Sequence, residues 1–240
     1  MEYKNALKIA ELLTAKMSDY SERILIAGSI RRKKAECRDI EIIAVPKWSK
    51  EIPEKLRVEA TVKKPQKKPE SEFSPMLPCN WELFGDADKE KSYIPPDYSP
   101  EPLNLLYLWG NRQNLIRWIK PGVGEAITWR IVPDGRYWRG IVESETHLPI
   151  KLDLFLCQPE NWGVISTIRT GPAGFSSAMM ATIRNRTRFQ VDGGFLTVKE
   201  TGEQIPCFEE TDFFTNCGFR YVPVSERSAA NPYVLFQVEK

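Results

Sequence analysis

The sequence predicts an α+β fold, built as a mixed antiparallel sheet backed by helices and followed by a small C-terminal α/β subdomain. Three observations support this prediction. Short apolar runs typical of strands occupy residues 23–27, 39–45 and 150–156. Apolar residues recur at helical spacing near the N-terminus. Turn signals built from Gly, Asp and Pro separate the later segments.

The first half of the chain is expected to contain one helix and two strands. Residues 2–19 predict an amphipathic helix, whose apolar positions are Ala6, Ile9, Leu13 and Met17. Strands follow at 23–27 and 39–45. Residues 62–78, rich in Pro, Lys and Ser, are expected to be a linker or surface loop, and residues 93–102 to lack regular structure.

The second half alternates strands and helices. Residues 125–132 and 136–142 predict two strands around a Pro-Asp-Gly turn, and residues 150–156 predict a third. Pro near each start predicts two helices, at 159–169 and 172–184. A hairpin around Asp192, Gly193 and Gly194 and an acidic helix at 208–218 complete the predicted elements.

Composition narrows the class of protein. The 240 residues include 34 Lys and Arg against 32 Asp and Glu, a formal charge of +2, so nucleic-acid contacts would depend on local clustering of cations. No segment has the features of a secretory signal or the length of a membrane span. Five scattered cysteines and one histidine make a zinc site unexpected and favour a reducing cytoplasm.

Three carboxylates are predicted to gather on one face of the sheet. Side chains alternate faces along a strand, so Asp39 and Glu41 share a face. The same alternation places Asp153 on one face of the strand at 150–156. If these strands pair, the three carboxylates converge and repel one another, which raises their pKa values unless a cation joins them. Oxygen ligands favour Mg²⁺ or Mn²⁺.

The segment before the carboxylates offers groups that suit a triphosphate. Gly28 allows a close backbone approach, and Ser29 supplies a hydroxyl and an N–H at the start of a short helix. Arg32 supplies a bidentate fork for phosphate oxygens. Each part alone is also typical of an ordinary turn or an exposed strand face. Their order along one short segment favours a phosphoryl-transfer site, in which two metal ions clamp the attacking and leaving oxygens.

A basic cluster near the C-terminal subdomain is a candidate nucleic-acid contact. Arg184, Arg186 and Arg188 alternate with Asn and Thr, which would suit the phosphates of a primer-template strand. A solvated face is the alternative interpretation.

The motifs resemble those of a known superfamily. Residues 28–45, GSIRRKKAECRDIEIIAV, resemble the G-S-x-x-R…D-x-[DE] signature of the DNA polymerase β-like nucleotidyltransferases, the X family of DNA polymerases. Residues 150–171 resemble the family's strand with the third catalytic Asp, its following helix and its Thr-Gly turn. Residues 188–227 resemble its small C-terminal subdomain. The chain is closest in kind to small phage and bacterial members.

The resemblance implies a domain organisation. A nucleotidyltransferase palm would span residues 1–182, with an insertion at about 47–119. A thumb-like subdomain would span 183–240. The match covers 20–46 and 120–227 and leaves the insertion unexplained. No lyase domain is expected, since only about twenty residues precede the first strand.

The resemblance also implies roles for single residues. Two Mg²⁺ or Mn²⁺ ions would be bound by Asp39, Glu41 and Asp153, and Asp153 would also be positioned to activate the primer hydroxyl. The triphosphate would be held by Gly28, Ser29 and Arg32. The Thr170-Gly171 turn would lie along the sugar and base. The expected partners are a nucleoside triphosphate and primer-template or gapped DNA, and the expected protein is a monomer without membrane attachment.

Three departures from the family bear on substrate choice. Cys37-Arg38 stands where Ser-Gly is usual, Ile168-Arg169 stands where an aromatic pair usually packs on the sugar, and Pro172, Ala173 and Gly174 replace polar positions that often touch the incoming base. Because Ile168-Arg169 replaces the aromatic pair, we expect weak discrimination between dNTPs and NTPs. Transfer to another acceptor, such as a tRNA end, a protein or a small molecule, is the alternative function. A catalytically silent nucleic-acid-binding subunit is a third, which the carboxylate triad argues against.

Overall fold

The computed structural model describes residues 1–56, 98–113, 115–119, 128–129, 136–143 and 149–227. The chain divides into two compact units, one made of Met1–Trp48 with Asn104–Lys240 and the other of Ser49–Leu103. The second unit falls within the expected insertion. The expected linker at 62–78 lies outside the described residues.

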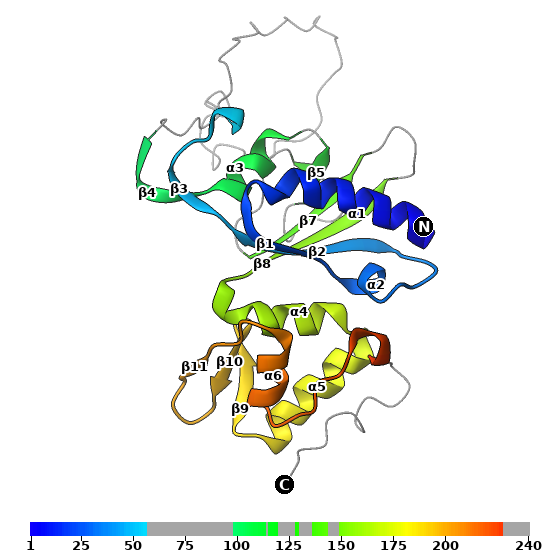
Figure 1. Ribbon diagram of the computed structural model, residues 1–240, viewed down its shortest axis with the longest axis vertical. Coiled ribbons are helices and arrows are strands. Elements are labelled where there is room, and N and C mark those ends of the chain that lie inside the picture. Colours follow the sequence, from blue (N-terminus) through cyan, green and yellow to red (C-terminus); the bar gives the residue numbers. More distant parts are fainter. Residues whose placement is uncertain (57–97, 114, 120–127, 130–135, 144–148, 228–240) are drawn as a thin grey trace, which may run out of the picture. The chain divides into compact units, whose positions relative to one another are not determined.

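The first unit contains a six-stranded mixed sheet (Figure 1). Its strands, in spatial order, are β1 (Ser21–Ile26), β2 (Asp39–Pro46), β8 (Ile150–Leu156), β7 (Tyr137–Val142), β5 (Ile116–Ile119) and β6 (Thr128–Trp129). β2 and β8 run parallel, and the other neighbours pair antiparallel. The predicted α+β class and the predicted mixed sheet are both confirmed.

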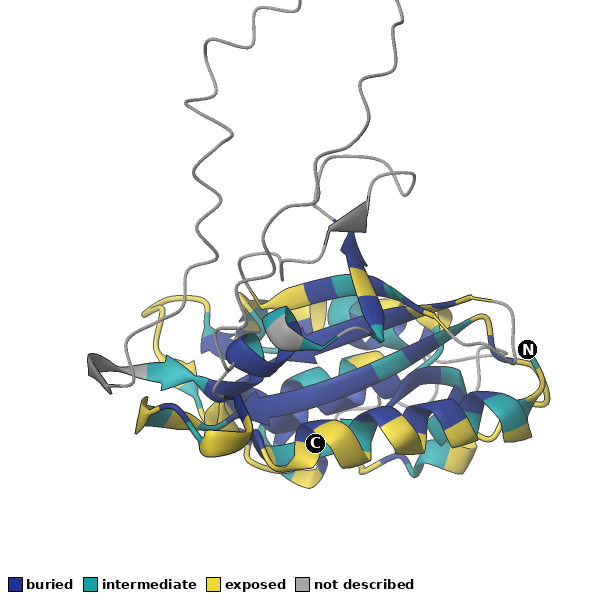
Figure 2. Cartoon of the chain, turned by 90° about the horizontal axis from the view of Figure 1, so that it is seen from above, coloured by how far each residue is buried: buried dark blue, intermediate teal, exposed yellow. Residues whose placement is uncertain are grey.

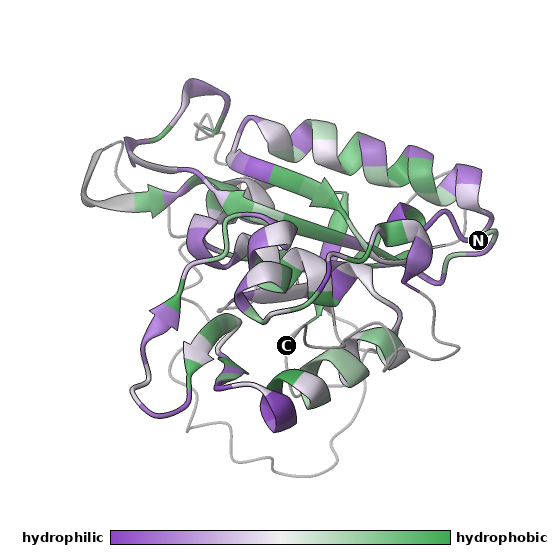
Figure 3. Ribbon diagram, turned by 60° about the horizontal axis from the view of Figure 1, so that its bottom comes forward, coloured by the Kyte–Doolittle hydropathy of each residue, from purple (hydrophilic) through white to green (hydrophobic). Residues whose placement is uncertain are grey.

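One face of this sheet forms the apolar core. The inward residues alternate along the central strands and are Ile40, Ile42, Leu152, Leu154, Trp118 and Trp138, all buried. Helix α1 (Tyr3–Ser18) buries the predicted stripe of Ala6, Ile9, Leu13 and Met17, and its apolar and polar residues alternate in Figure 3. Helix α3 (Leu105–Arg112) packs here too, since the Trp118 indole N–H donates to the Gly110 carbonyl at 3.0 Å.

The opposite face is divided into an apolar part and a polar part. Helix α4 (Trp162–Thr170) covers the apolar part through Trp162, which packs with Ile43, Val45 and Phe155. The polar part lies at the beginning of β2, next to the short helix α2 (Gly28–Arg31). Figure 2 shows the strands as mostly buried, with exposed residues on the outer surfaces of the helices. The first part of β2 and the neighbouring Asp153 of β8 therefore belong to the polar part of this face.

A second apolar cluster holds the C-terminal elements together. It joins α4 to α5 (Ala173–Arg186), β9 (Phe189–Asp192), β10 (Phe195–Val198), β11 (Gln204–Ile205) and α6 (Glu210–Asn216). The predicted hairpin is confirmed, because Phe195 pairs with Asp192 across β9 and β10. Gly193 and Gly194 adopt φ values of 53° and 86° in its turn, a conformation that glycine adopts without strain.

The structure differs locally from the predicted elements. Strands are found within both segments predicted at 125–132 and 136–142, as β6 and β7, but β6 pairs with β5 and not with β7; residues 125–127 and 130–135, including the predicted turn, lie outside the described residues. β5 itself was not predicted. Residues 98–104, expected to be irregular at least to 102, form β4 (Tyr98–Asn104), which pairs with β3 (Trp48–Glu51). A 3₁₀ helix, Glu54–Leu56, follows β3. These strands are short, and pairing partners distant in sequence decide whether they form.

Candidate active site

The register of β2 and β8 brings the three predicted carboxylates to one face. Glu41 lies opposite Asp153, and Asp39 lies opposite Lys151. Directly opposed residues on paired strands point to the same face. Asp39, Glu41 and Asp153 therefore share the polar part of the sheet, as the alternation predicted.

Glu41 is the carboxylate whose ionisation is most affected. Burial, followed by repulsion from Asp39 and Asp153, raises the pKa of Glu41 from its ordinary value to about 7, although Arg32 and Arg169 act in the opposite direction. Such a carboxylate is stabilised by any cation that binds beside it. The charges of Asp39 and Asp153 therefore act directly on the ionisation of Glu41.

Gly28 allows the chain to pass directly against Glu41. Its φ of +60° lies in the left-handed region, and a Cβ at this position would lie 1.7 Å from Glu41 Oε2. The Ala27 amide also donates to the Glu41 carbonyl at 2.8 Å. No residue with a side chain fits here without displacing the carboxylate.

Asp153 is held by two side chains from β7. The Tyr137 hydroxyl donates to Oδ1 at 2.8 Å, and Arg139 donates through Nε to Oδ1 at 2.8 Å and through a terminal nitrogen to Oδ2 at 3.1 Å. Burial, together with the hydrogen bond to Asp153 and its charge, raises the pKa of Tyr137. Asp153 is only 7% exposed. The hydrogen bonds from Tyr137 and Arg139 therefore take the place of most of the water that would surround an exposed carboxylate.

The carboxylates are not arranged as a ready-made metal centre. Within the described ranges, no three His, Cys, Asp or Glu side chains lie close enough together to hold a metal ion. In addition, both oxygens of Asp153 accept hydrogen bonds from Arg139. The donor chemistry still suits Mg²⁺ or Mn²⁺, since it consists of carboxylate oxygens that repel one another.

The predicted phosphate residues contain buried polar atoms without partners. Among the described residues, only three buried side-chain N or O atoms lack a hydrogen-bond partner, and two of them are Ser29 Oγ and Arg32 Nε; the third is Thr167 Oγ1. Burial lowers the pKa of Arg32, while the charges of Glu41 and Asp39 act against this shift. Unpaired buried polar atoms are costly, so their occurrence within one short segment needs an explanation.

The predicted Thr170-Gly171 turn lies beside the same arginines. Thr170 is fully buried; its hydroxyl accepts from Arg31 at 2.7 Å, and its carbonyl accepts from Arg32. Gly171 packs tightly, since a Cβ there would lie 2.4 Å from Phe175 Cδ1. The turn therefore contacts Arg31 and Arg32, while its expected contact with a sugar and base stays a prediction.

The two residues before this turn point in different directions. Ile168 packs against the C-terminal apolar cluster. The guanidinium carbon of Arg169 lies 3.9 Å from the centroid of the Phe155 ring, and its charge acts on Glu41. The Phe155 ring also stacks with Tyr137, with centroids 4.9 Å apart. Arg169 thus joins the carboxylate face, and Ile168 belongs to the core.

The basic cluster is exposed. Arg184 and Arg186 lie in the last turn of α5, and Arg188 lies just before β9 with its guanidinium carbon 5.0 Å from the Phe189 ring centroid. Their exposure suits both a nucleic-acid contact and a solvated face, so their role stays a prediction.

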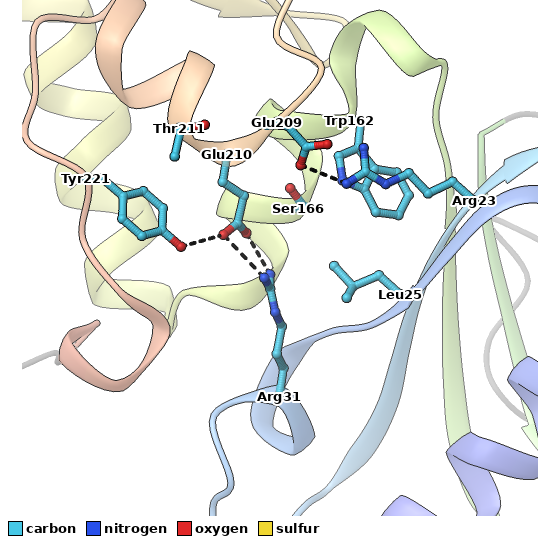
Figure 4. Close-up of a pocket in the computed structure, with 9 residues that line it drawn as sticks. All are labelled: Arg23, Leu25, Arg31, Trp162, Ser166, Glu209, Glu210, Thr211 and Tyr221. Carbon is cyan, nitrogen blue, oxygen red and sulfur yellow. Dashed lines mark hydrogen bonds and ion pairs between the residues drawn. The ribbon is translucent and has the colours of Figure 1, made fainter.

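A pocket of about 240 Å³ lies among residues of β1, α2, α4 and α6 (Figure 4). It is lined by Arg23, Leu25, Arg31, Trp162, Ser166, Glu209, Glu210, Thr211 and Tyr221. Its charged groups are paired, Arg23 with Glu209 at 2.7 Å and Arg31 with Glu210 at 2.6 Å. None of the predicted catalytic residues lines it.

Sequence reasoning missed Tyr137, Arg139 and Arg31 as residues of the site region. Alternation within RYWRG places Tyr137 and Arg139 on one face of a strand, which was a usable signal. What was missing was the pairing of β7 with β8, which sets Arg139 opposite Asp153. Arg31 carried no comparable signal, because its partner Glu210 is distant in sequence.

No described helix combines the length and apolar character needed to cross a bilayer. In comparisons with known proteins, no family model matches the chain and no curated protein matches it.

Proposed function

We propose that this chain catalyses metal-dependent nucleotidyl transfer from a nucleoside triphosphate to a nucleic-acid 3′ hydroxyl. The observation that carries the proposal is the placement of two unpartnered buried donors, Ser29 Oγ and Arg32 Nε, in the segment that leads to the carboxylates of β2 and β8. A triphosphate supplies acceptor oxygens for both donors. Its α-phosphate would then lie near Asp39, Glu41 and Asp153.

The charges of the carboxylate face support a divalent cofactor. Glu41 has a raised pKa because it is buried beside two other carboxylates, and bound cations relieve this repulsion. Two Mg²⁺ or Mn²⁺ ions would be held by Asp39, Glu41 and Asp153, and would supply Lewis-acid stabilisation of the oxygens around the reacting phosphorus.

The chain's own residues would orient the reactants. Ser29 and Arg32 fix the triphosphate, so that the acceptor 3′ oxygen can attack the α-phosphorus in line with the bond to the β-phosphate. The new P–O bond forms as that bond breaks, pyrophosphate leaves, and the hydroxyl proton passes to Asp153 or to solvent. Arg32 neutralises charge that develops on the leaving pyrophosphate.

The test is a transfer assay with labelled dNTPs and NTPs, offered with single-stranded, primed and gapped oligonucleotides and with Mg²⁺ or Mn²⁺. Wild-type protein should extend a 3′ end. Asp39→Asn, Glu41→Gln and Asp153→Asn should each reduce the rate at least a hundredfold, about 2.7 kcal/mol of activation free energy. Circular dichroism checks that each variant is folded.

Asp192→Asn is the matched control, because this exposed carboxylate lies in the β9–β10 hairpin turn. It should transfer at the wild-type rate. Full activity in any two of the three site variants would overturn the metal assignment. Label appearing on the protein or on a small molecule, with none on the oligonucleotides, would favour the alternative acceptor.

A further inference from the structure

Strand β1 lies at one end of the six-stranded sheet, and only one of its two edges is paired (Figure 1). Its partner is β2, and no other strand of the described residues lies beside it. The open edge of a strand presents N–H and C=O groups that readily pair with another strand. β1 therefore offers a position for one more strand in this sheet.

The backbone groups of Ile24 and Ile26 point to this open edge. The Ala27 amide donates to the Glu41 carbonyl at 2.8 Å, so these two residues form a hydrogen-bonded pair of the β1–β2 ladder. Hydrogen-bonded and non-hydrogen-bonded pairs alternate along an antiparallel ladder. Ile26 and Ile24 fall in the non-hydrogen-bonded pairs, and their N–H and C=O groups therefore face away from β2.

The side chains of β1 leave apolar surface partly exposed on both faces of the sheet. Ile24 and Ile26 lie on the face that α1 covers, and Leu25 lies on the face that α4 covers. All three are only partly buried. An apolar strand edge that stays uncovered promotes association with other chains. The composition of β1 therefore favours cover by another apolar strand.

The chain itself contains a segment of this kind. Residues 228–240 lie outside the described residues, and they include the sequence YVLFQV at 233–238. Most of these residue types have a high strand propensity. Pro232 precedes them, and proline suits the boundary of a strand because it has no N–H to donate. Side-chain alternation gives the segment one wholly apolar face, made of Val234, Phe236 and Val238.

The end of the described chain indicates the direction from which this segment approaches β1. Arg227 donates to Glu210 at 2.8 Å, and the same carboxylate accepts from Arg31 of α2 at 2.6 Å. α2 begins at Gly28, directly after β1. The chain after Arg227 therefore starts near the C-terminal end of β1, and residues 228–234 can span up to about 23 Å. A strand that enters from this end runs antiparallel to β1.

We propose that residues 235–240 bind the open edge of β1 as an antiparallel strand, in the register that places Val238 opposite Ile24 and Phe236 opposite Ile26. Opposed apolar residues stabilise antiparallel strands. These side chains lie on the face that α1 covers, and the backbone groups of each pair exchange hydrogen bonds across the new edge. No residue of the candidate active site takes part, so the inference does not depend on nucleotidyl transfer.

Charge selects this register over its neighbours. It places Lys240 beside Glu22, an exposed carboxylate that takes part in none of the ion pairs found among the described residues. A shift of two residues in one direction would place Val238 beside Glu22. The opposite shift would place Lys240 opposite Ile24, where the ammonium group meets an apolar side chain. Pairs of opposite charge on neighbouring strands are favourable, so the proposed register satisfies both the charged and the apolar residues.

Amide hydrogen exchange, followed by NMR on the full chain, measures the new hydrogen bonds directly. The Ile24 and Ile26 amides donate to the added strand, so they should exchange at least about a hundredfold more slowly than amides of an unstructured chain. The amides of Arg23 and Leu25 face β2 and serve as an internal reference for folding. They should stay protected in every variant.

Proline at three successive positions should give an alternating pattern that a paired strand produces. Phe236→Pro and Val238→Pro each remove an N–H that donates to β1, so each should speed exchange of the Ile24 and Ile26 amides at least about tenfold. Gln237→Pro is the matched control, because the amide of Gln237 points away from β1 and an edge strand accepts proline at such a position. It should exchange like wild type.

A charge reversal tests the register. Lys240→Glu places two carboxylates side by side, so it should speed exchange of the Ile24 and Ile26 amides by up to about fivefold. Adding Glu22→Lys restores a pair of opposite charge, and the double variant should return to the wild-type rate.

Fast exchange of the Ile24 and Ile26 amides in the full wild-type chain would overturn the inference, as would equal effects of the three proline variants. Protection that survives Val238→Pro but is lost on dilution, with a dimer in sedimentation velocity, would assign the edge to a second copy of the chain and overturn the inference as well. If the double charge reversal does not restore the wild-type rate, the proposed register is wrong.

Discussion

Gly28 allows the start of α2 to lie directly against the Glu41 carboxylate. A Cβ there would lie 1.7 Å from Glu41 Oε2, and φ is +60°. Gly28→Ala should destabilise the fold by about 1–3 kcal/mol and displace Glu41, with loss of most transfer activity. Urea unfolding and the transfer assay measure the two effects.

A matching substitution at Gly193 serves as the control for Gly28→Ala, because it introduces similar backbone strain without the steric clash. Gly193 has a similar φ of +53°, but nothing lies within 4 Å of its added Cβ. Gly193→Ala should therefore cost some stability and leave transfer unchanged. Equal activity of the two alanine variants would show that the contact between Gly28 and Glu41 is unimportant.

Arg32 should act through phosphate and not through the nucleoside. Its Nε is buried without a partner, and its guanidinium lies beside Glu41 and Asp39. Arg32→Ala should weaken triphosphate binding by about 1.5–3 kcal/mol, as expected for a charge-assisted hydrogen bond. Calorimetry with the triphosphate and the matching nucleoside measures this, and Lys34→Ala, an exposed cation of the same loop, is the control. An equal loss of affinity for the nucleoside would contradict the assignment.

If the chain transfers nucleotides as proposed, Ile168 and Arg169 would bear on the choice of sugar. Ile168 packs into the C-terminal cluster and Arg169 lies over Phe155, so neither side chain replaces an aromatic wall. We expect a preference for dNTPs over NTPs below about a hundredfold, since one or two missing contacts are worth about 1–3 kcal/mol each. Steady-state incorporation of matched pairs measures it. A preference above about a thousandfold, or ~4 kcal/mol, would place the exclusion of the 2′ hydroxyl elsewhere, for example at a backbone carbonyl.

At the scale of elements, long periodic segments were predictable and short strands were not. α1 follows from four apolar residues at helical spacing, and β2 and β8 follow from continuous apolar runs. The convergence of Asp39, Glu41 and Asp153 needed only alternation and one assumed pairing, which the register bears out. β5 and β6 have four and two residues, and their place in the sheet depends on partners that local sequence does not specify.

Tyr137 and Arg139 were missed as partners of Asp153 for the same reason, because local sequence does not specify which strands pair. Alternation gives the face of a side chain, but not the strand beside it. Once β7 lies next to β8, Arg139 faces Asp153, and the carboxylate that was predicted to bind a metal forms an ion pair with it. Helical periodicity likewise predicts α4 without revealing that Thr170 accepts from two arginines of another element.

Gly140 holds β5 close to β7. A Cβ at this position would lie 2.5 Å from Ile116 Cγ2 and 3.0 Å from Trp118 Cε3. Gly140→Ala should destabilise the protein by about 1–3 kcal/mol, because the core on this side of the sheet has no space for a methyl group. Urea unfolding measures the change. Ile116→Ala in the same background should cost less than in the wild type, and additive effects in this double-mutant cycle would rule out the clash.

At the scale of the whole first unit, one buried ion cluster connects segments that are distant in sequence. Glu210 of α6 accepts from Arg31 of α2 at 2.6 Å and from Arg227 near the end of the described chain at 2.8 Å. Glu210 and Arg227 are only 7% and 3% exposed. Because Arg31 also donates to Thr170, this cluster links α2 to the end of α4 as well as to α6.

Because of Glu210 in this cluster, the free energy of unfolding should decrease as the pH falls into the acidic range. Burial alone would raise the pKa of Glu210, but the hydrogen bonds and charges of Arg227 and Arg31 outweigh it and lower that pKa below its ordinary value. Unfolded Glu210 therefore binds a proton more readily than folded Glu210. Its contribution to stability is complete above the unfolded pKa of about 4.3, and it is lost as the pH falls through the lower, native pKa.

Glu210→Gln should reveal this contribution. At neutral pH the variant should lose about 3–5 kcal/mol, because Arg227 is left buried without its anionic partner. Below about pH 4 the unfolded wild-type carboxyl binds a proton more readily than the folded one, so the difference between the two proteins should shrink as the pH falls further. Urea unfolding at several pH values measures the difference. Glu226→Gln, whose carboxylate is exposed in its pair with Arg220, should change stability by less than about 1 kcal/mol at any pH. A difference between wild type and Glu210→Gln that stays constant down to about pH 3 would mean that the charge of Glu210 does not stabilise the folded state.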